Sequence, residues 1–198
     1  GRFSAVEINN TYYRMPTSDL LAKWRDGTPD GFRFALKAPQ QITHIKKLKN
    51  VSETTAAFCA AAGELGDKLG PLLFGLPPSL KRDTGLLADF LASIPKEARV
   101  AIEFRHESWF DESVYSVLRS HHAALCVAEA DDLVTPMVAT TGWGYLRLRR
   151  TRYTPNDLQR WANLVREQAW SEAMIFFKHE DEARGPEYAQ ALIALVRK

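Results

Sequence analysis

A charged pair, Glu103 and Arg105, lies at the end of a short apolar run of the sequence. If the run is a β-strand, alternation directs both side chains to one face, whereas Phe104 between them faces the other side. Burying a carboxylate and a guanidinium costs on the order of several kcal/mol unless they pair or serve a ligand. The pattern therefore indicates either a substrate site or an ion pair that only closes the end of the fold.

Two lysines, Lys37 and Lys178, also follow apolar runs. A desolvated lysine can form a Schiff base with a carbonyl substrate or can hold an anion. The alternative is a lysine that pairs with Glu7 or Glu103. We expect pairing rather than covalent catalysis, and a paired lysine can still contribute to anion binding.

A basic segment follows the next-to-last apolar run, with Arg147, Arg149, Arg150 and Arg152. Alternation sends Arg147 and Arg149 to the same face of a strand. The segment indicates either an anion site or a solvated basic loop. The helix expected from Gly185 could add free backbone amide groups to an anion site.

Three histidines, His44, His106 and His179, raise the question of a metal ion. A catalytic zinc site needs three or more His, Asp or Glu groups that converge and leave a coordination position open. The sequence has no His-Glu-x-x-His or similar spacing, and the adjacent residues His179, Glu180 and Asp181 rarely all point inward. We therefore expect no cofactor, and histidines that hydrogen bond at loop starts rather than bind a metal.

Seven short runs rich in apolar, β-branched and aromatic residues must position these groups. Several are apolar almost throughout, as is typical of strands buried on both faces of a parallel sheet. Helical patterns with start signals separate all but one pair of runs, the exception being a loop between Glu129 and Gly144. The predicted strands are Phe3 to Ile8, Phe32 to Lys37, Leu72 to Leu76, Val100 to Phe104, Leu125 to Ala128, Tyr145 to Leu148 and Met174 to Phe177.

The helices are predicted from their first residues. Thr17, Asp83 and Asp111 precede helical patterns as N-caps, and Thr154-Pro155 with Asp157 has the form of a capping box. Ser52 opens an Ala-rich helix, and Gly185-Pro186-Glu187 opens the last one.

A repeated βα unit is typical of either an open doubly wound sheet or a closed barrel. The first run is not followed by a Gly-x-Gly-x-x-Gly or Walker loop, which disfavours the open nucleotide-binding sheet. A closed barrel uses eight strands. We therefore predict one domain over residues 1–198, an α/β fold of the (β/α) TIM-barrel type with seven strands visible and the first βα unit absent upstream. In such barrels the chemistry sits at the C-terminal ends of the strands.

Composition excludes several classes of protein. The chain has 198 residues, 45% hydrophobic and 25% charged, which is the ordinary globular range. No apolar stretch approaches the roughly 20 residues of a membrane span, no secretory signal is visible, and the net charge of +2 does not by itself indicate a nucleic-acid partner. Cys59 and Cys126 lie in separate apolar segments, so we expect buried thiols and a cytoplasmic protein.

Five separated motifs at the predicted strand ends resemble the YecE-like family, catalogued as domain of unknown function 72. The resemblance covers nearly the whole chain and implies a TIM-barrel-like fold of bacterial cytoplasmic proteins whose activity is not established. Two departures are a missing Gly-rich first strand and helix, and Gly75 where the family commonly has Gln. The motifs are Glu7-Ile8-Asn9-x-Thr11-Tyr12-Tyr13, Phe34-x-x-Lys37-Ala38-Pro39 with Thr43-His44, Leu73-Phe74-x-Leu76-Pro77-Pro78-Ser79, Glu103-Phe104-Arg105-His106-x-Ser108-Trp109 and Phe176-Phe177-Lys178-His179-Glu180-Asp181.

Together these features favour an enzyme, a hydrolase or lyase, that binds a small phosphate- or carboxylate-bearing molecule at the strand ends. The alternatives are nucleic-acid binding or endonuclease-like activity, and a non-catalytic binding module; a membrane partner is not expected. The candidate catalytic residues are Glu7, Glu103, His106 and His179. The candidate substrate-binding residues are Asn9, Lys37, Arg105, Trp109, Arg147, Arg149 and Lys178.

Overall fold

A computed structural model describes residues 3–130, 133–177 and 184–196. The chain forms two compact units, residues 1–123 and residues 124–198, and each is described by itself. The first unit contains β1 Ala5–Ile8, α1 Ser18–Asp26, β2 Arg33–Lys37, α2 Ser52–Gly63, β3 Leu69–Gly75, α3 Thr84–Ala92, β4 Val100–Glu103 and α4 Glu112–Ser120. The second contains β5 Ala124–Glu129, β6 Trp143–Leu148, α5 Pro155–Arg166, β7 Glu172–Phe177 and α6 Gly185–Val196.

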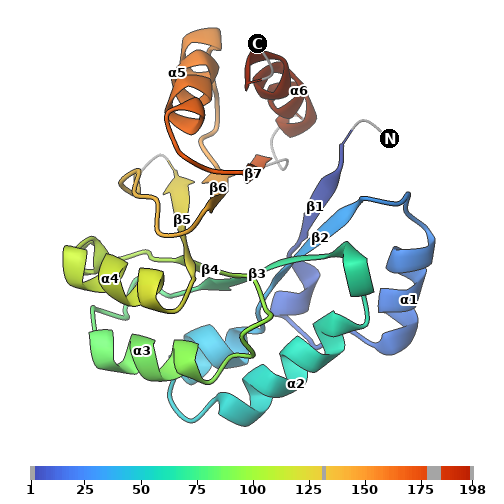
Figure 1. The fold of residues 1–198 in the computed structure, drawn as a ribbon, viewed down its shortest axis with the longest axis vertical. Coiled ribbons are helices and arrows are strands. Elements are labelled where there is room, and N and C mark those ends of the chain that lie inside the picture. Colours follow the sequence, from blue (N-terminus) through green and yellow to red (C-terminus); the bar gives the residue numbers. More distant parts are fainter. Residues whose placement is uncertain (1–2, 131–132, 178–183, 197–198) are drawn as a thin grey trace. The chain divides into compact units, whose positions relative to one another are not determined.

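The four strands of the first unit pair in parallel and in sequence order (Figure 1). Six of the seven predicted strands differ from the observed ones by no more than two residues at either end. The exception is β3, which begins at Leu69 instead of Leu72 although Pro71 has no amide hydrogen to donate. The register between β2 and β3 shifts between Phe34 and Leu36, so the pairing is irregular where the proline lies.

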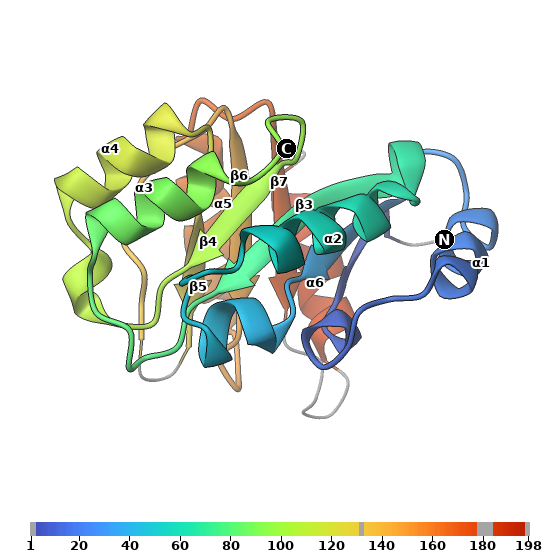
Figure 2. The same ribbon diagram turned by 90° about the horizontal axis from the view of Figure 1, so that it is seen from below.

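One face of this sheet packs against helices. The ring of Phe74 in β3 lies 6.3 Å from Phe58 of α2 and 5.1 Å from Phe90 of α3, centroid to centroid, and Figure 2 shows these two helices alongside the strands. Because side chains alternate along a strand, Gly75, the residue after Phe74, faces away from these helices. The register between the strands puts three residues of the neighbouring strands on the same face as Gly75, namely Glu7, Lys37 and Glu103.

Most helices begin at the predicted caps. The side chains of Thr17, Asp83, Asp111 and Thr154 each accept a hydrogen bond from an amide in the first turn, and Thr154 forms the predicted capping box with Asp157. The helix α2 begins at Ser52 as predicted, although the preceding residue, Val51, provides no side-chain cap. Among the residues that the structure describes, none of the helices combines the length and the apolar composition that crossing a bilayer requires.

Four short helices were not predicted, because three to five residues carry too little periodicity to detect. Three of them follow strands of the first unit. The short helices are η1 Asn10–Tyr12, the π-helix η2 Gln41–Ile45, η3 Gly66–Lys68 and η4 Glu107–Trp109.

The second unit holds a parallel sheet of β5, β6 and β7. Leu146 and Leu148 of β6 pack with Trp161 of α5 and Leu192 of α6, so these helices cover one face of that sheet. The segment between β5 and β6 contains no helix among its described residues, as predicted, and Glu129 bridges to Val134 within it.

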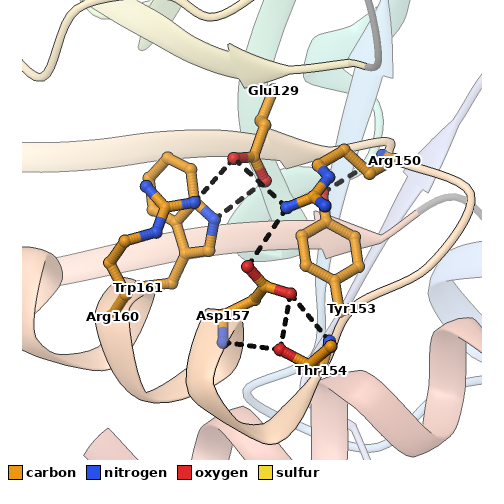
Figure 3. A network of polar contacts seen from close by, with 7 residues as sticks. All are labelled: Glu129, Arg150, Tyr153, Thr154, Asp157, Arg160 and Trp161. Carbon is orange, nitrogen blue, oxygen red and sulfur yellow. Dashed lines mark hydrogen bonds and ion pairs between the residues drawn. The ribbon is translucent and has the colours of Figure 1, made fainter.

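A carboxylate is buried beneath α5. Glu129 is the last residue of β5, is 3% exposed, and shares its side of the sheet with Val127 and the helix-facing core. Figure 3 shows its carboxylate between Arg150 on one side and Arg160 with Trp161 on the other. Arg160 Nη2 donates to it at 2.7 Å and Trp161 Nε1 at 2.9 Å. These donors offset the cost of desolvating the charge.

The same network holds the loop between β6 and α5. Arg150 lies 4.0 Å from the Glu129 carboxylate and 3.2 Å from that of Asp157, and its backbone amide donates to the hydroxyl of Tyr153 at 3.1 Å. Burial raises the pKa of Tyr153, so its hydroxyl stays neutral and keeps this contact. The loop is therefore tied to the sheet and to the first turn of the helix.

We expect Glu129→Leu to lower the free energy of unfolding by about 3 kcal/mol, because buried donors lose their acceptor. Glu129→Gln should cost less, since its amide oxygen can still accept from Trp161. Arg160→Ala should cost less than about 1 kcal/mol, because that arginine is half exposed. Urea-induced unfolding measures the stability of all three variants. An equal loss of stability in Arg160→Ala and Glu129→Leu would contradict the role of Glu129 as the central acceptor of the network.

Candidate functional site

The C-terminal ends of β1, β2 and β4 bring five side chains of the first unit together. We call this group the strand-end cluster: Tyr12, Lys37, His44, Glu103 and Arg105. The ammonium of Lys37 lies 4.2 Å from the centroid of the Tyr12 ring, and His44 packs edge-on against the same ring at 5.1 Å. Arg105 Nη2 lies 3.5 Å from Glu103 Oε1. Residues separated by up to 93 positions in the sequence thus become neighbours, because the strands that carry them are parallel and lie side by side.

Gly75 leaves the space that the carboxylate of Glu103 occupies. A Cβ at position 75 would lie 3.1 Å from Glu103 Oε2 and 4.0 Å from Lys37 Cε. Glu103 is 2% exposed, so its carboxylate has little room to move. This chain has Gly75 where the family commonly has Gln, so no side chain stands at the point where Glu103 and Lys37 come close.

Arg105 is both an ion-pair partner and an accessible group. Its side chain is 26% exposed, whereas that of Glu103 is 3% exposed. The two side chains thus form the pair that the sequence allowed, with the guanidinium on the outer side. An arginine in this position can neutralise a buried carboxylate and still present donors to a ligand.

The electrostatic field of the cluster acts on His44. Burial lowers the pKa of its imidazole below 6.5, Arg105 and Lys37 lower that pKa further, and Glu103 opposes them with a smaller effect. Nδ1 of His44 lies 2.8 Å from the hydroxyl of Thr43. His44 is therefore neutral at pH 7 and lies in a net positive field.

From the sequence, His44 was expected to hydrogen bond at a loop start rather than to bind a metal, and it was not among the candidate site residues. The signal that could have found it is its place seven residues after Lys37, in the turn that follows the strand. Within residues 3–130, 133–177 and 184–196, the structure contains no group of three His, Cys, Asp or Glu side chains arranged to hold a metal ion.

The turn after β1 is fastened to β2. The hydroxyl of Thr11, which is almost fully buried, donates to the backbone oxygen of Lys37 at 2.6 Å. The next residue, Tyr12, is thereby held against the Lys37 side chain. Burial raises the pKa of Tyr12 and Arg105 opposes that effect, so the phenol is neutral at pH 7.

Glu7 and Asn9 lie next to this turn. Nδ2 of Asn9 donates to Glu7 Oε1 at 3.2 Å. Glu7 is half-buried and shares its face of the sheet with Lys37, whereas Asn9 is exposed. Both candidate residues therefore lie at the same end of the sheet as the cluster.

The segment after β4 has mainly a structural role. Trp109 is fully buried, stacks on Phe104 at 4.6 Å, and donates through Nε1 to the backbone oxygen of Leu80 at 2.7 Å. The structure thus places this predicted substrate-binding residue in the core. His106 Nδ1 lies 2.9 Å from Ser108 Oγ and also accepts from the Ser108 amide, so this histidine caps η4.

The remaining candidate residues belong to the second unit. Arg147 is buried and, by alternation, lies on the sheet face opposite to Leu146 and the helices. Arg149 is half-buried, and its amide donates to the backbone oxygen of Glu129 at 2.7 Å. Lys178 and His179 lie outside the described residues.

The cluster makes the pKa of His44 a test of its geometry. We expect Arg105→Ala to raise that pKa, because a cation is removed, and Glu103→Gln to lower it, because an anion is removed. Arg119→Ala on the surface of α4 is the matched control and should leave it unchanged. Titration of the imidazole by NMR measures all three, and a pKa equally insensitive to Arg105 and Arg119 would refute the cluster.

His44 also affects stability in a defined pH window. Its pKa in the folded chain is below the 6.5 of an unperturbed imidazole, so the unfolded chain takes up the proton first as the pH falls. The difference in free energy of unfolding between wild type and His44→Gln should therefore be constant above about pH 7. Below about pH 6.5, wild type should lose stability relative to His44→Gln. Urea-induced unfolding at several pH values tests this, and parallel pH profiles for the two proteins would contradict it.

Comparison with solved structures shows the fold. A DUF72 family protein from Enterococcus faecalis V583 matches 98% of this chain and 85% of its own, with a TM-score of 0.85 and 16% identity. A DUF72 family protein from Thermotoga maritima MSB8 matches 99% of this chain and 85% of its own, with a TM-score of 0.82 and 24% identity. The predicted α/β fold of the (β/α) TIM-barrel type is confirmed.

Sequence comparison identifies relatives and the family. The UPF0759 protein YecE of Escherichia coli K12 is 32% identical over 109 residues, which cover 54% of this chain and 40% of YecE. The UPF0759 protein YunF of Bacillus subtilis 168 is 26% identical over 121 residues, which cover 57% of this chain and 43% of YunF. These alignments thus span less than half the length of each relative. The family described as "Protein of unknown function DUF72" matches residues 1–198, and the chain belongs to it.

Proposed function

We propose that this chain is an enzyme that binds a small anionic molecule, bearing a phosphate or a carboxylate, at the strand-end cluster. One observation carries the proposal. The guanidinium of Arg105, which is partly exposed, and the ammonium of Lys37 both lie close to the buried carboxylate of Glu103 at the same end of the sheet. Arginine and lysine side chains gathered at one place favour an anionic ligand.

Arg105 is the main anion-binding group of the proposal. Its guanidinium is partly exposed, stays charged at every physiological pH, and can donate two parallel hydrogen bonds to one carboxylate or phosphate. Lys37 contributes a point charge that is held over the Tyr12 ring. Lys37 is the last residue of β2, and Arg105 lies two residues after the end of β4.

Glu103 is the proposed acid–base group. Its carboxylate is buried beside two cations, so it is positioned to exchange a proton with a ligand held by Arg105. His44, neutral at pH 7, can assist as a second proton carrier next to Tyr12. This differs from the sequence-based hypothesis, in which His106 or His179 assisted.

The proposal predicts binding of simple anions to the wild-type chain. We expect inorganic phosphate or citrate to bind, and Arg105→Ala to weaken that binding at least about tenfold, because a charge-assisted pair is lost. Arg105→Lys keeps the charge but loses the planar fork, so it should bind with intermediate affinity.

Isothermal titration calorimetry measures these affinities, with Arg119→Ala on α4 as the matched control. Removing Arg119 changes the net charge by the same amount at a distant surface pair with Glu112. Equal affinities in Arg105→Ala and Arg119→Ala would mean that the cluster does not bind the anion. Failure of wild type to bind either anion would overturn the proposal.

A further inference from the structure

The turns that follow the strands of the first unit carry an excess of positive charge. They are residues 9–17, 38–51, 76–83 and 104–111, after β1, β2, β3 and β4. Together they contain seven lysine and arginine residues and three aspartate and glutamate residues, whereas the rest of residues 1–123 contains nine and eleven. The small net charge of the whole chain, +2, therefore hides a concentration of positive charge at one end of this sheet.

Most of these cations have no acidic partner. Arg82 pairs with Asp111 at 2.9 Å, and Arg105 pairs with Glu103. Within residues 3–130, 133–177 and 184–196, the other five form no ion pair, and all but one of them are exposed. These five are Arg14, Lys46, Lys47, Lys49 and Lys81. Their charge is not neutralised by the protein and is available to an anionic partner.

Contacts between the turns join them into one continuous edge. The ring of Tyr12, after β1, packs against that of His44, after β2, at 5.1 Å. The amide of Arg82, after β3, donates to the hydroxyl of Ser108, after β4, at 2.9 Å. Figure 2 shows the short helices after β1 and β2, dark blue and light blue, along the lower edge of this unit. Neighbouring strands lie about 4.8 Å apart, so the ends of four paired strands extend over about 14 Å.

We infer that this edge binds a single-stranded nucleic acid. A nucleic-acid strand carries one charge about every 3.4 Å, so about four phosphates lie along about 14 Å of strand. A row of unpaired cations of that length matches a linear polyanion better than a single small anion. The inference goes beyond the proposed function, because it concerns the cations of the turns and needs no chemistry at the strand-end cluster.

An exposed aromatic ring in the same row favours nucleic acid over other polyanions. Tyr13 is 70% exposed, precedes Arg14 in the turn after β1, and packs edge-on against Tyr12 at 5.1 Å. Bases stack on such rings whatever their sequence, whereas an acidic peptide has no base to place there. The strand must be single, because the bases of a duplex are stacked on one another.

The test measures binding of a fluorescein-labelled oligothymidylate of about 12 nucleotides by fluorescence anisotropy. Wild type should bind it, and more weakly as salt is added, because phosphate contacts release counterions. The double variant Lys46→Gln, Lys49→Gln should bind at least about tenfold more weakly at about 50 mM salt and lower the slope of log K against log salt by about 1.4. The matched control, Lys23→Gln, Lys96→Gln, removes two exposed lysines from α1 and from the turn before β4 and should bind like wild type.

Two further measurements separate nucleic acid from other polyanions. Tyr13→Ala should lower the affinity at least about fivefold and leave the salt dependence unchanged, because stacking releases no counterions. Tyr13→Phe keeps the ring and should bind like wild type. Polyglutamate should displace the labelled strand at least about fivefold less effectively than unlabelled oligothymidylate, since it has no bases.

Each contrary result has a definite meaning. Failure of wild type to bind the oligonucleotide, or an equal loss of affinity in the two double variants, would overturn the inference. Equal displacement by polyglutamate, or an unchanged affinity in Tyr13→Ala, would show that charge alone is recognised and would contradict nucleic acid as the partner. Neither double variant changes Arg105 or Lys37, so a wild type that binds the oligonucleotide but not inorganic phosphate or citrate would overturn only the proposed function.

Discussion

The buried carboxylate of Glu103 is the constraint on which the arrangement of the first unit depends. A charge that is 2% exposed is tolerated only when opposite charges or donors surround it, and here Arg105 lies 3.5 Å away while Lys37 approaches the same point above Gly75. The lysine in turn lies over Tyr12, which the Thr11 hydroxyl ties to the end of β2. Burial lowers the pKa of the neighbouring His44, and the same two cations lower it further.

A second buried carboxylate, Glu129, shows that burial of charge alone does not mark a site. Glu103 and Glu129 both end strands and are almost equally inaccessible. Glu103 lies on the face opposite to the helices, whereas Glu129 faces α5 and is satisfied by Arg160 and Trp161 on that helix. The first has a partly exposed arginine as its neighbour and can affect a ligand. The second holds a helix and a loop to the sheet.

The strand ends of the first unit carry two kinds of surface. Lys37 ends β2 and Arg105 follows β4, and both provide charge, whereas Tyr13 directly after η1 and Ile45 at the end of η2 are exposed apolar residues. Relatives of the same family share the fold, with TM-scores of 0.85 and 0.82 despite identities of 16% and 24%. A barrel of this type positions its chemistry through such turns, so differences between relatives in these turns are expected to change the ligand rather than the fold.

Local patterns in the sequence determined much of this protein. The strands follow from apolar runs, the capping box from Thr154 and Asp157 three residues apart, and the pairing of Glu103 with Arg105 from their i, i+2 spacing. Each of these depends on interactions between residues that are close in the chain. Only the tertiary structure decided that Trp109 is a core residue, that His44 rather than His106 joins the cluster, and that Glu129 finds its donors 31 and 32 residues away. Those contacts depend on the register between strands and on turns too short to show a period, and neither is encoded in the spacing of a single segment.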